Sequence, residues 1–236
     1  ITSASGAIKG GLKLTGPWND PQLTGTVQTD RGMMTVGGMS TPILNIGGTA
    51  SFQGKSASFS GGASVGGGRI EARGNAAWDK SALSDYKGTL TLASPSVDSA
   101  VYKGKADGNL QIEDIDGKPK LSGDITLHHA VMDVPYQMAL NSRNTDILLD
   151  VRLKIGSSVR LYNKYLYDIP LSGAVTAAGS PLHPEMSGKV EAVKGQVRYL
   201  YNEFNVEHGE AVWGGMTDSF LPILHVLADT HIGHYY

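Results

Sequence analysis

The stretch Pro119-Lys120-Leu121-Ser122-Gly123-Asp124-Ile125-Thr126-Leu127-His128 contains the two features that decide the fold of this chain. Its second half alternates apolar and polar residues, which is the period of a β-strand with one dry face and one solvated face. Its first half places a proline, which cannot donate a ladder hydrogen bond, ahead of a glycine that frees the backbone for a bend or bulge. The stretch therefore predicts a turn followed by a strand of a half-buried sheet.

The first half of this stretch recurs twice more along the chain. The pattern Pro, any residue, Leu or Met, Ser or Thr, Gly, any residue, Val or Ile is found at 21–27, 119–125 and 184–190. The first and third copies also share flanking glycines at an offset of 163 residues, so that Gly10 matches Gly173. Internal repetition indicates an elongated stack of supersecondary units. Because the copies are 98 and 65 residues apart, we expect repeated strand-turn-strand units with variable insertions and no constant period.

The rest of the chain shows the same alternation and no convincing helix. The alternation is clearest over 150–161, where Arg152, Lys154 and Arg160 share the polar face. Gly or Pro interrupts nearly every window long enough for a helix, and the best helical candidate, 76–85, is short and polar. The Gly- and Ser-rich interval 54–68 still alternates, so we interpret it as small-residue strands and turns. The predicted fold class is all-β.

Composition excludes several classes of protein. The 236 residues contain 20 basic and 22 acidic side chains without a basic cluster, which gives no support to nucleic-acid binding. There is no cysteine, and therefore no disulfide or thiolate chemistry. No linker or shift in composition marks a domain boundary. The chain has neither an initiator Met nor an apolar segment near twenty residues, so we interpret 1–236 as a single elongated fragment of a longer repetitive protein.

Patterns that would carry chemistry are weak. Asp229, His231 and His234 are metal-capable, but on a strand the third would face away from the first two, so polar residues near a chain end are the simpler interpretation. The segment 114–117 contains two aspartates but lacks the remaining calcium ligands, which favours an ordinary turn. No nucleophile, phosphate-loop or dinucleotide pattern occurs ahead of a helix. We expect no catalytic residue, no metal and no cofactor.

The segment Leu-Leu-Asp-Val-Arg-Leu-Lys-Ile-Gly-Ser-Ser-Val-Arg-Leu at 148–161 resembles the TamB family of cell-envelope proteins, the inner-membrane component of a translocation and assembly module, within the AsmA-like bridge-type lipid transfer proteins. The likeness continues through 171–173, 179–188, 193–197 and 206–213. It is good over about 145–225, which places the family-like C-terminal portion at about 145–236, and it is looser before that. These motifs are strands and turns, and none is catalytic.

The resemblance implies an elongated U-shaped β-sheet, a taco-like trough with an apolar concave face. In such proteins the trough is thought to shield phospholipid acyl chains between the inner and outer membranes. The family is also linked to protein secretion and to outer-membrane protein assembly through a barrel partner of the Omp85 type. The location implied is the periplasm of a diderm bacterium, with the full-length protein tethered to the inner membrane. This chain lacks that anchor and most of the repeats, as expected of an excised piece.

The resemblance and the shared strand parity together predict which side chains line the concave face. They are Val151, Leu153, Ile155, Val159, Leu161, Leu171, Val175, Val190 and Val197, with Ile125 and Leu127 from the middle copy of the repeat. Each shielded methylene contributes about 0.8 kcal/mol, so such a face suits flexible hydrocarbon. The same residues would also make the closed core of a β-sandwich.

Two other classes of protein remain as alternatives. A structural or assembly β-scaffold, or an adhesin-like β-solenoid, would have a similar composition, although a solenoid requires a constant period. A carbohydrate-active β-helix enzyme would need clustered carboxylates, whereas Asp and Glu are scattered singly here.

Overall fold

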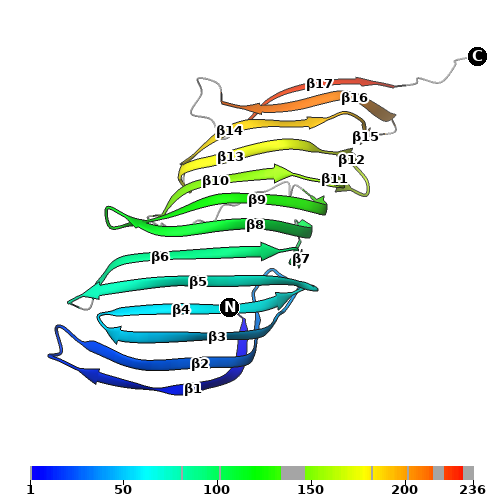
Figure 1. The fold of residues 1–236 in the computed structure, drawn as a ribbon. Helices are drawn as coiled ribbons and strands as arrows, with labels where there is room; N and C mark the ends of the chain where they lie inside the picture. The colour runs from blue at the N-terminus through cyan, green and yellow to red at the C-terminus, as the bar shows by residue number, and fades with distance from the viewer. Residues whose placement is uncertain are drawn as a thin grey trace, which may run out of the picture.

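The computed structural model describes residues 2–80, 82–100, 102–133, 147–181, 183–200, 202–214 and 221–230, which form one sheet of 17 strands (Figure 1). The strands are β1 (Ser3–Thr15), β2 (Gln22–Thr35), β3 (Ile43–Gly54), β4 (Ser56–Val65), β5 (Gly68–Asp79), β6 (Ala82–Ala93), β7 (Ser96–Asp98), β8 (Tyr102–Ile115), β9 (Lys118–Met132), β10 (Leu148–Ile155), β11 (Arg160–Asn163), β12 (Tyr167–Pro170), β13 (Ser172–Ser180), β14 (His183–Ala192), β15 (Gly195–Tyr199), β16 (Asn202–Trp213) and β17 (Ile223–Asp229).

The all-β prediction is confirmed, and no helix occurs among these residues. The interval 54–68 forms β4 and its flanking turns, as predicted. The short, polar stretch 76–85 is not a helix, because its two halves belong to the hairpin of β5 and β6, where their residues pair across the sheet. Within the part of the chain that is described, no helix is long and apolar enough to cross a membrane.

The strands follow one another across the sheet almost in chain order. Pairing is antiparallel throughout from β1 to β9. The short β7 follows the end of β6 and also pairs antiparallel with β8. The chain then returns so that β10 and β11 run parallel to β9, after which antiparallel pairing resumes. The short strands β7, β11, β12 and β15 each lie end to end with a longer strand, and we call such a line of strands a row. The 17 strands therefore form thirteen rows. At about 4.8 Å per row the trough is about 60 Å long.

The three copies of the repeat occupy equivalent places in three hairpins. Pro21 directly precedes β2, and the other two motif prolines are the second residues of β9 and β14, consistent with a residue that cannot donate within a ladder. The motif glycines, Gly25, Gly123 and Gly188, have φ angles of 139°, 136° and 122° inside their strands. A Cβ at these positions would lie 2.0, 2.1 and 2.3 Å from a carbonyl oxygen of the preceding strand. The glycine is thus required by close approach of two strands and not by a bulge.

A crease crosses the rows and divides the sheet into a long main wall and a short second wall. It is built from register shifts in β1, β2, β3, β8 and β16, and from breaks between β6 and β7 and between β10 and β11. Non-glycine residues with positive φ mark it, among them Arg31, Asn45, Ser94, His129 and Ser158. Bulges increase local twist and bend the strand. The U shape therefore comes from backbone irregularities repeated row by row.

The second wall is interrupted at the hairpin of β4 and β5, whose turn lies at the crease. There the segment between β2 and β3, residues 36–42, reaches across to β7. Met39 forms an isolated bridge with Ser99, the Ser40 N–H donates to the Asp98 carbonyl at 2.7 Å, and the Asp98 N–H donates to Thr41 Oγ1 at 3.0 Å. We call this segment the strap, since it connects the two parts of the second wall.

The best-packed side chains lie at the crease, on the inside of the bend. Ala130 is fully buried and Val159 is 2% exposed, and together with Leu127 they form the core cluster. Partly buried neighbours from β8, β9 and β10 pack against this cluster. Side chains from the two walls converge at this place, so the crease is where a single curved sheet can exclude water without a second layer.

Candidate functional site

The register places the apolar residues of all rows on the same face. Leu110 of β8 pairs with Gly123 of β9, which pairs with Val151 of β10, and Leu153 of β10 pairs with Val175 of β13. The N-terminal rows continue this face with alternating Leu, Val, Phe, Ile and Ala residues. Among the described residues no second layer covers this face, and many of its large side chains remain exposed or half-buried. The chain thus forms an open trough with an apolar concave side.

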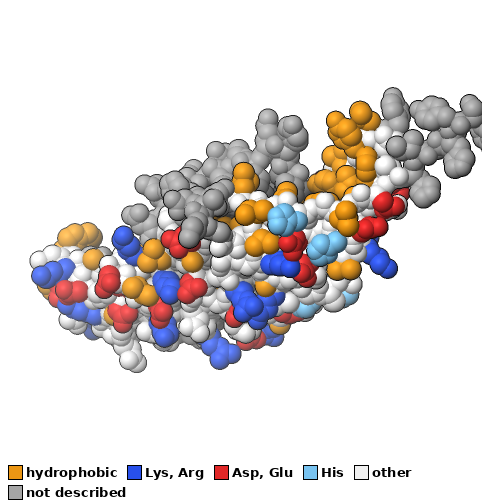
Figure 2. All heavy atoms as spheres, turned by 90° about the horizontal axis from the view of Figure 1, so that it is seen from above, with side chains coloured by type: hydrophobic (Ala, Val, Ile, Leu, Met, Phe, Trp, Pro, Cys, Tyr) orange, Lys and Arg blue, Asp and Glu red, His pale blue; other side chains and the backbone are white. Residues whose placement is uncertain are grey.

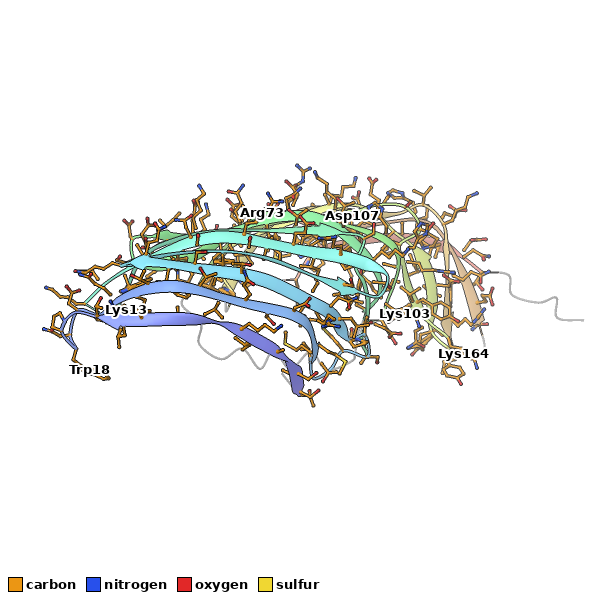
Figure 3. All side chains as sticks on the ribbon, turned by 60° about the horizontal axis from the view of Figure 1, so that its bottom comes forward. Lys13, Trp18, Arg73, Lys103, Asp107 and Lys164 are labelled. Atoms are coloured by element: carbon orange, nitrogen blue, oxygen red, sulfur yellow. The ribbon has the colours of Figure 1, made fainter. Side chains whose placement is uncertain are left out.

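The opposite face carries the charges. Lys120 pairs with Asp150 and Lys154 with Asp124, both at 3.2 Å across neighbouring strands. Figure 3 shows Arg73 and Asp107 pointing away from the concave side of the curved sheet. In Figure 2 the Lys and Arg side chains are interspersed with Asp and Glu along the surface. Within the described part of the chain no charged or polar residue is buried.

The most distinct cavity of the concave side lies between β1 and β5. It has a volume of about 470 Å³ and an almost wholly apolar lining. The lining comes from five successive strands and includes Ile8, Val27, Met34, Ile43, Ile46, Ala50, Phe59, Ala63, Ile70 and Ala72.

Glycines shape the floor of this hollow. Phe59 lies over the neighbouring strand, where a Cβ on Gly74 would come within 2.6 Å of its ring. A Cβ on Gly48 would lie 2.8 Å from the Ser60 carbonyl, so this row also requires a residue without a side chain. The alternation of large side chains with glycine therefore leaves recesses between ridges, which is a shape that a flexible apolar chain can follow.

The structure brings most of the predicted lining residues together. Val151, Leu153 and Ile155 of β10 lie beside Gly123, Ile125 and Leu127 of β9 in one parallel register. Three more of the predicted lining residues lie on the same face: Val175 of β13, Val190 of β14, and Val159 at the crease. Beyond the crease, Leu161 of β11 pairs with Met132 and Ile169, and Val197 of β15 pairs with Tyr167 and Phe204. Leu171 lies at the crease, where its N–H donates to the Val159 carbonyl.

The lining of the N-terminal hollow was not among the residues predicted from the sequence. Its clearest signal was the first motif copy, since Leu23, Gly25 and Val27 share one strand face as their counterparts do. The segment containing Ile43 and Ile46 was harder to interpret, because these residues differ in parity. Both line the hollow because a bulge between Leu44 and Gly47 shifts the alternation by one residue.

A polar cluster centred on Glu210 lies on the outer face. The Glu210 carboxylate of β16 lies 2.8 Å from Lys189 Nζ and 3.1 Å from His225 Nδ1. Hydrogen bonds from Lys189 and His225 hold the pKa of Glu210 below its usual value. In the described residues no three metal-capable side chains converge. Of the weak metal candidate, Asp229 ends β17, while His231 and His234 lie outside the described residues. Asp116 and Gly117 form the two-residue turn between β8 and β9, as favoured above.

The sequence profile of the family described as TamB C-terminal domain matches residues 1–127 and 57–233. The chain belongs to the TamB family. The two overlapping matches extend the likeness over the N-terminal half, where only the repeats had indicated it. No curated protein and no solved structure matched the chain.

Membership in the TamB family gives the chain a role in the translocation and assembly module of the cell envelope of Gram-negative bacteria. The family is a non-catalytic transport and assembly component, associated with an Omp85-type partner. The all-β trough agrees with the fold that the sequence resemblance implied.

Proposed function

We propose that the concave face is a lipid conduit, which shields phospholipid acyl chains as they cross the periplasm between the inner and outer membranes. The observation that supports this most is the continuous apolar face over thirteen rows, left open by the described residues. A sheet with one apolar face needs a cover of protein or of an apolar ligand. The same proposal includes an inner-membrane tether for the full-length protein, docking to an Omp85-type barrel, and 1–236 as one segment of a longer trough.

The physical chemistry of the face fits acyl chains. Its side chains are mostly aliphatic, and its ridges and recesses do not enclose a ligand of one defined shape. Each methylene transferred from water contributes about 0.8 kcal/mol, so a sixteen-carbon chain gains on the order of 10 kcal/mol before ordering costs. The charged outer face remains in water, and headgroups projecting from the open side would remain there too. The trough would thus shield the acyl chains of a phospholipid from water while its headgroup stays in water.

The proposal is tested by lipid co-purification read by native mass spectrometry and lipid extraction, compared with a soluble β protein from the same cells. Leu153→Asp on the apolar face of β10 should abolish the phospholipid signal, because it places a carboxylate where the acyl chain would lie. Arg152→Asp is the matched control, since it adds the same group to the same strand on the opposite face. It should leave the lipid signal unchanged.

Two results would argue against the conduit. The first is a folded Leu153→Asp variant that retains as much phospholipid as the unmodified chain. The second is a monodisperse protein that carries no lipid and refuses added phospholipid. Either result would favour the structural or assembly scaffold, in which the concave face is covered by protein.

A further inference from the structure

Two hairpin turns form a protruding ledge at the rim of the second wall. The turn between β11 and β12 comprises residues 164–166, and the turn between β15 and β16 follows Tyr199. They are fastened to each other, because the Arg198 N–H donates to the Leu166 carbonyl at 2.7 Å and Arg198 Nη1 donates to the Lys164 carbonyl at 3.4 Å. In Figure 3 Lys164 lies at the rim opposite to Trp18. The ledge comprises Lys164, Tyr165, Leu166, Arg198, Tyr199 and Leu200.

The ledge exposes large apolar side chains beside cations. Tyr165 is 73% exposed and Leu200 79%, and Leu166 and Tyr199 are also more than half exposed. Lys164 Nζ lies 5.5 Å from the centre of the Tyr165 ring, and Arg198 pairs with Glu203 at 3.2 Å. The nearby charges therefore sum to a small positive excess. Protein surfaces that lie at a membrane–water interface typically combine tyrosine and leucine with lysine and arginine.

The backbone at Leu200 gives a second, independent observation. Tyr199 pairs with Asn202, so the turn has two residues, and Leu200 in it has a φ of 56°. Two-residue hairpin turns of this kind favour Asn or Gly, because bulky residues are strained at positive φ. A leucine that is both strained and exposed serves neither the turn nor a core. Its side chain faces outward and is available for a contact outside the chain.

We propose that this ledge enters the headgroup layer of a lipid bilayer, with its leucines and tyrosines at the acyl boundary and Lys164 among the phosphates. The two turns expose their large apolar side chains to solvent, so they suit a deformable medium. The contact is separate from the concave face, because the ledge is formed by turns and the conduit by strand faces. It would hold the rim of the trough against a membrane surface.

The test is flotation of the 236-residue chain with intact vesicles, either of phosphatidylcholine alone or with part of it replaced by phosphatidylglycerol. We expect stronger association with the anionic vesicles at low salt, and loss of that difference near 1 M salt, where the screening length is about 3 Å. Leu200→Asn should lower partitioning about tenfold or more, since it removes an exposed leucine side chain that the bilayer would bury. Tyr165→Ser should act in the same direction.

The variants separate a surface contact from a folding defect. Asn suits a positive φ, so Leu200→Asn should unfold at the same or a higher urea concentration than the parent chain. Trp18→Ser, at the opposite rim, should leave vesicle association unchanged, although it too removes an exposed large apolar side chain. The proposal is overturned if the chain does not float with either vesicle, or if Leu200→Asn and Tyr165→Ser both float as the parent does. It is also overturned if Trp18→Ser alone abolishes association.

Discussion

Replacing Gly123 by alanine tests whether the repeated glycine is required by the close approach of two strands. The new Cβ would lie 2.1 Å from the Asn109 carbonyl oxygen and 3.0 Å from the Leu110 Cα, both of which are backbone atoms of β8. The φ of 136° adds strain, because side chains rarely adopt it. Backbone strain contributes about 1–3 kcal/mol and overpacking about 1–3 kcal/mol, against a gain of at most about 1 kcal/mol from the stiffer unfolded chain. We expect a loss of about 2–5 kcal/mol.

The assay follows from the one-dimensional architecture. Each row of the sheet contacts only its neighbouring rows, so the hydrogen bonds around Gly123 can open locally. The midpoint of a single global unfolding transition would therefore understate the local loss of stability. Native-state hydrogen exchange should therefore show a lower free energy of opening for peptides of β8 and β9, with a smaller change in distant rows. The matched control is Gly11→Ala, since a Cβ there meets no atom within 4 Å and the residue has no positive φ. If Gly123→Ala changes protection of β8 and β9 by less than about 0.5 kcal/mol, the close-approach argument is refuted.

Two further predictions concern the outer face. Asp107→Ala should destabilise the crease by about 1–3 kcal/mol in urea unfolding. The partly buried Asp107 carboxylate accepts hydrogen bonds from the Ser94 N–H at 2.7 Å and the Ser94 hydroxyl at 3.0 Å, and these bonds hold Ser94 at positive φ. Unchanged stability would show that the bend does not depend on these hydrogen bonds. Lys189 and His225 lower the pKa of Glu210 from 4.5, so the stability it contributes is present above about pH 4.5 and is lost as the pH falls through the lowered value. Hydrogen exchange of β16 and β17 should show this acid-induced loss in the parent chain, and Glu210→Gln should be less protected at neutral pH and lack that step.

The strand pattern and the apolar face could be predicted because they follow from local chemistry. Alternation places Val151, Leu153 and Ile155 on one face regardless of what pairs with them, and the structure keeps these residues together. The motif glycines were located correctly, although their role was expected to be a bend or bulge. Strand parity is a property of the chain itself, so it survives any choice of neighbour.

The crease and the parallel seam could not be predicted from the sequence. Positive φ occurs in the crease at ordinary residues such as Arg31 and His129, and nothing in their side chains distinguishes them from strand residues. The return of the chain that makes β10 parallel to β9 depends on tertiary pairing, because an antiparallel hairpin would show the same alternation. The N-terminal hollow was missed for the same reason, since a bulge brings Ile43 and Ile46 to one side despite their different parity.

The strap over residues 36–42 makes one part of the second wall mechanically different from the rest. Elsewhere the walls are continuous ladders, whereas here continuity depends on the bridge of Met39 with Ser99 and two hydrogen bonds at Asp98. Each such bond contributes about 1 kcal/mol, so separating the strap from β7 disrupts far less than unzipping a row. The opening would be sideways, next to the end of the hairpin of β4 and β5, and the main wall would keep its register. The trough therefore has a built-in weak point in its side, which a tube of uninterrupted strands would lack.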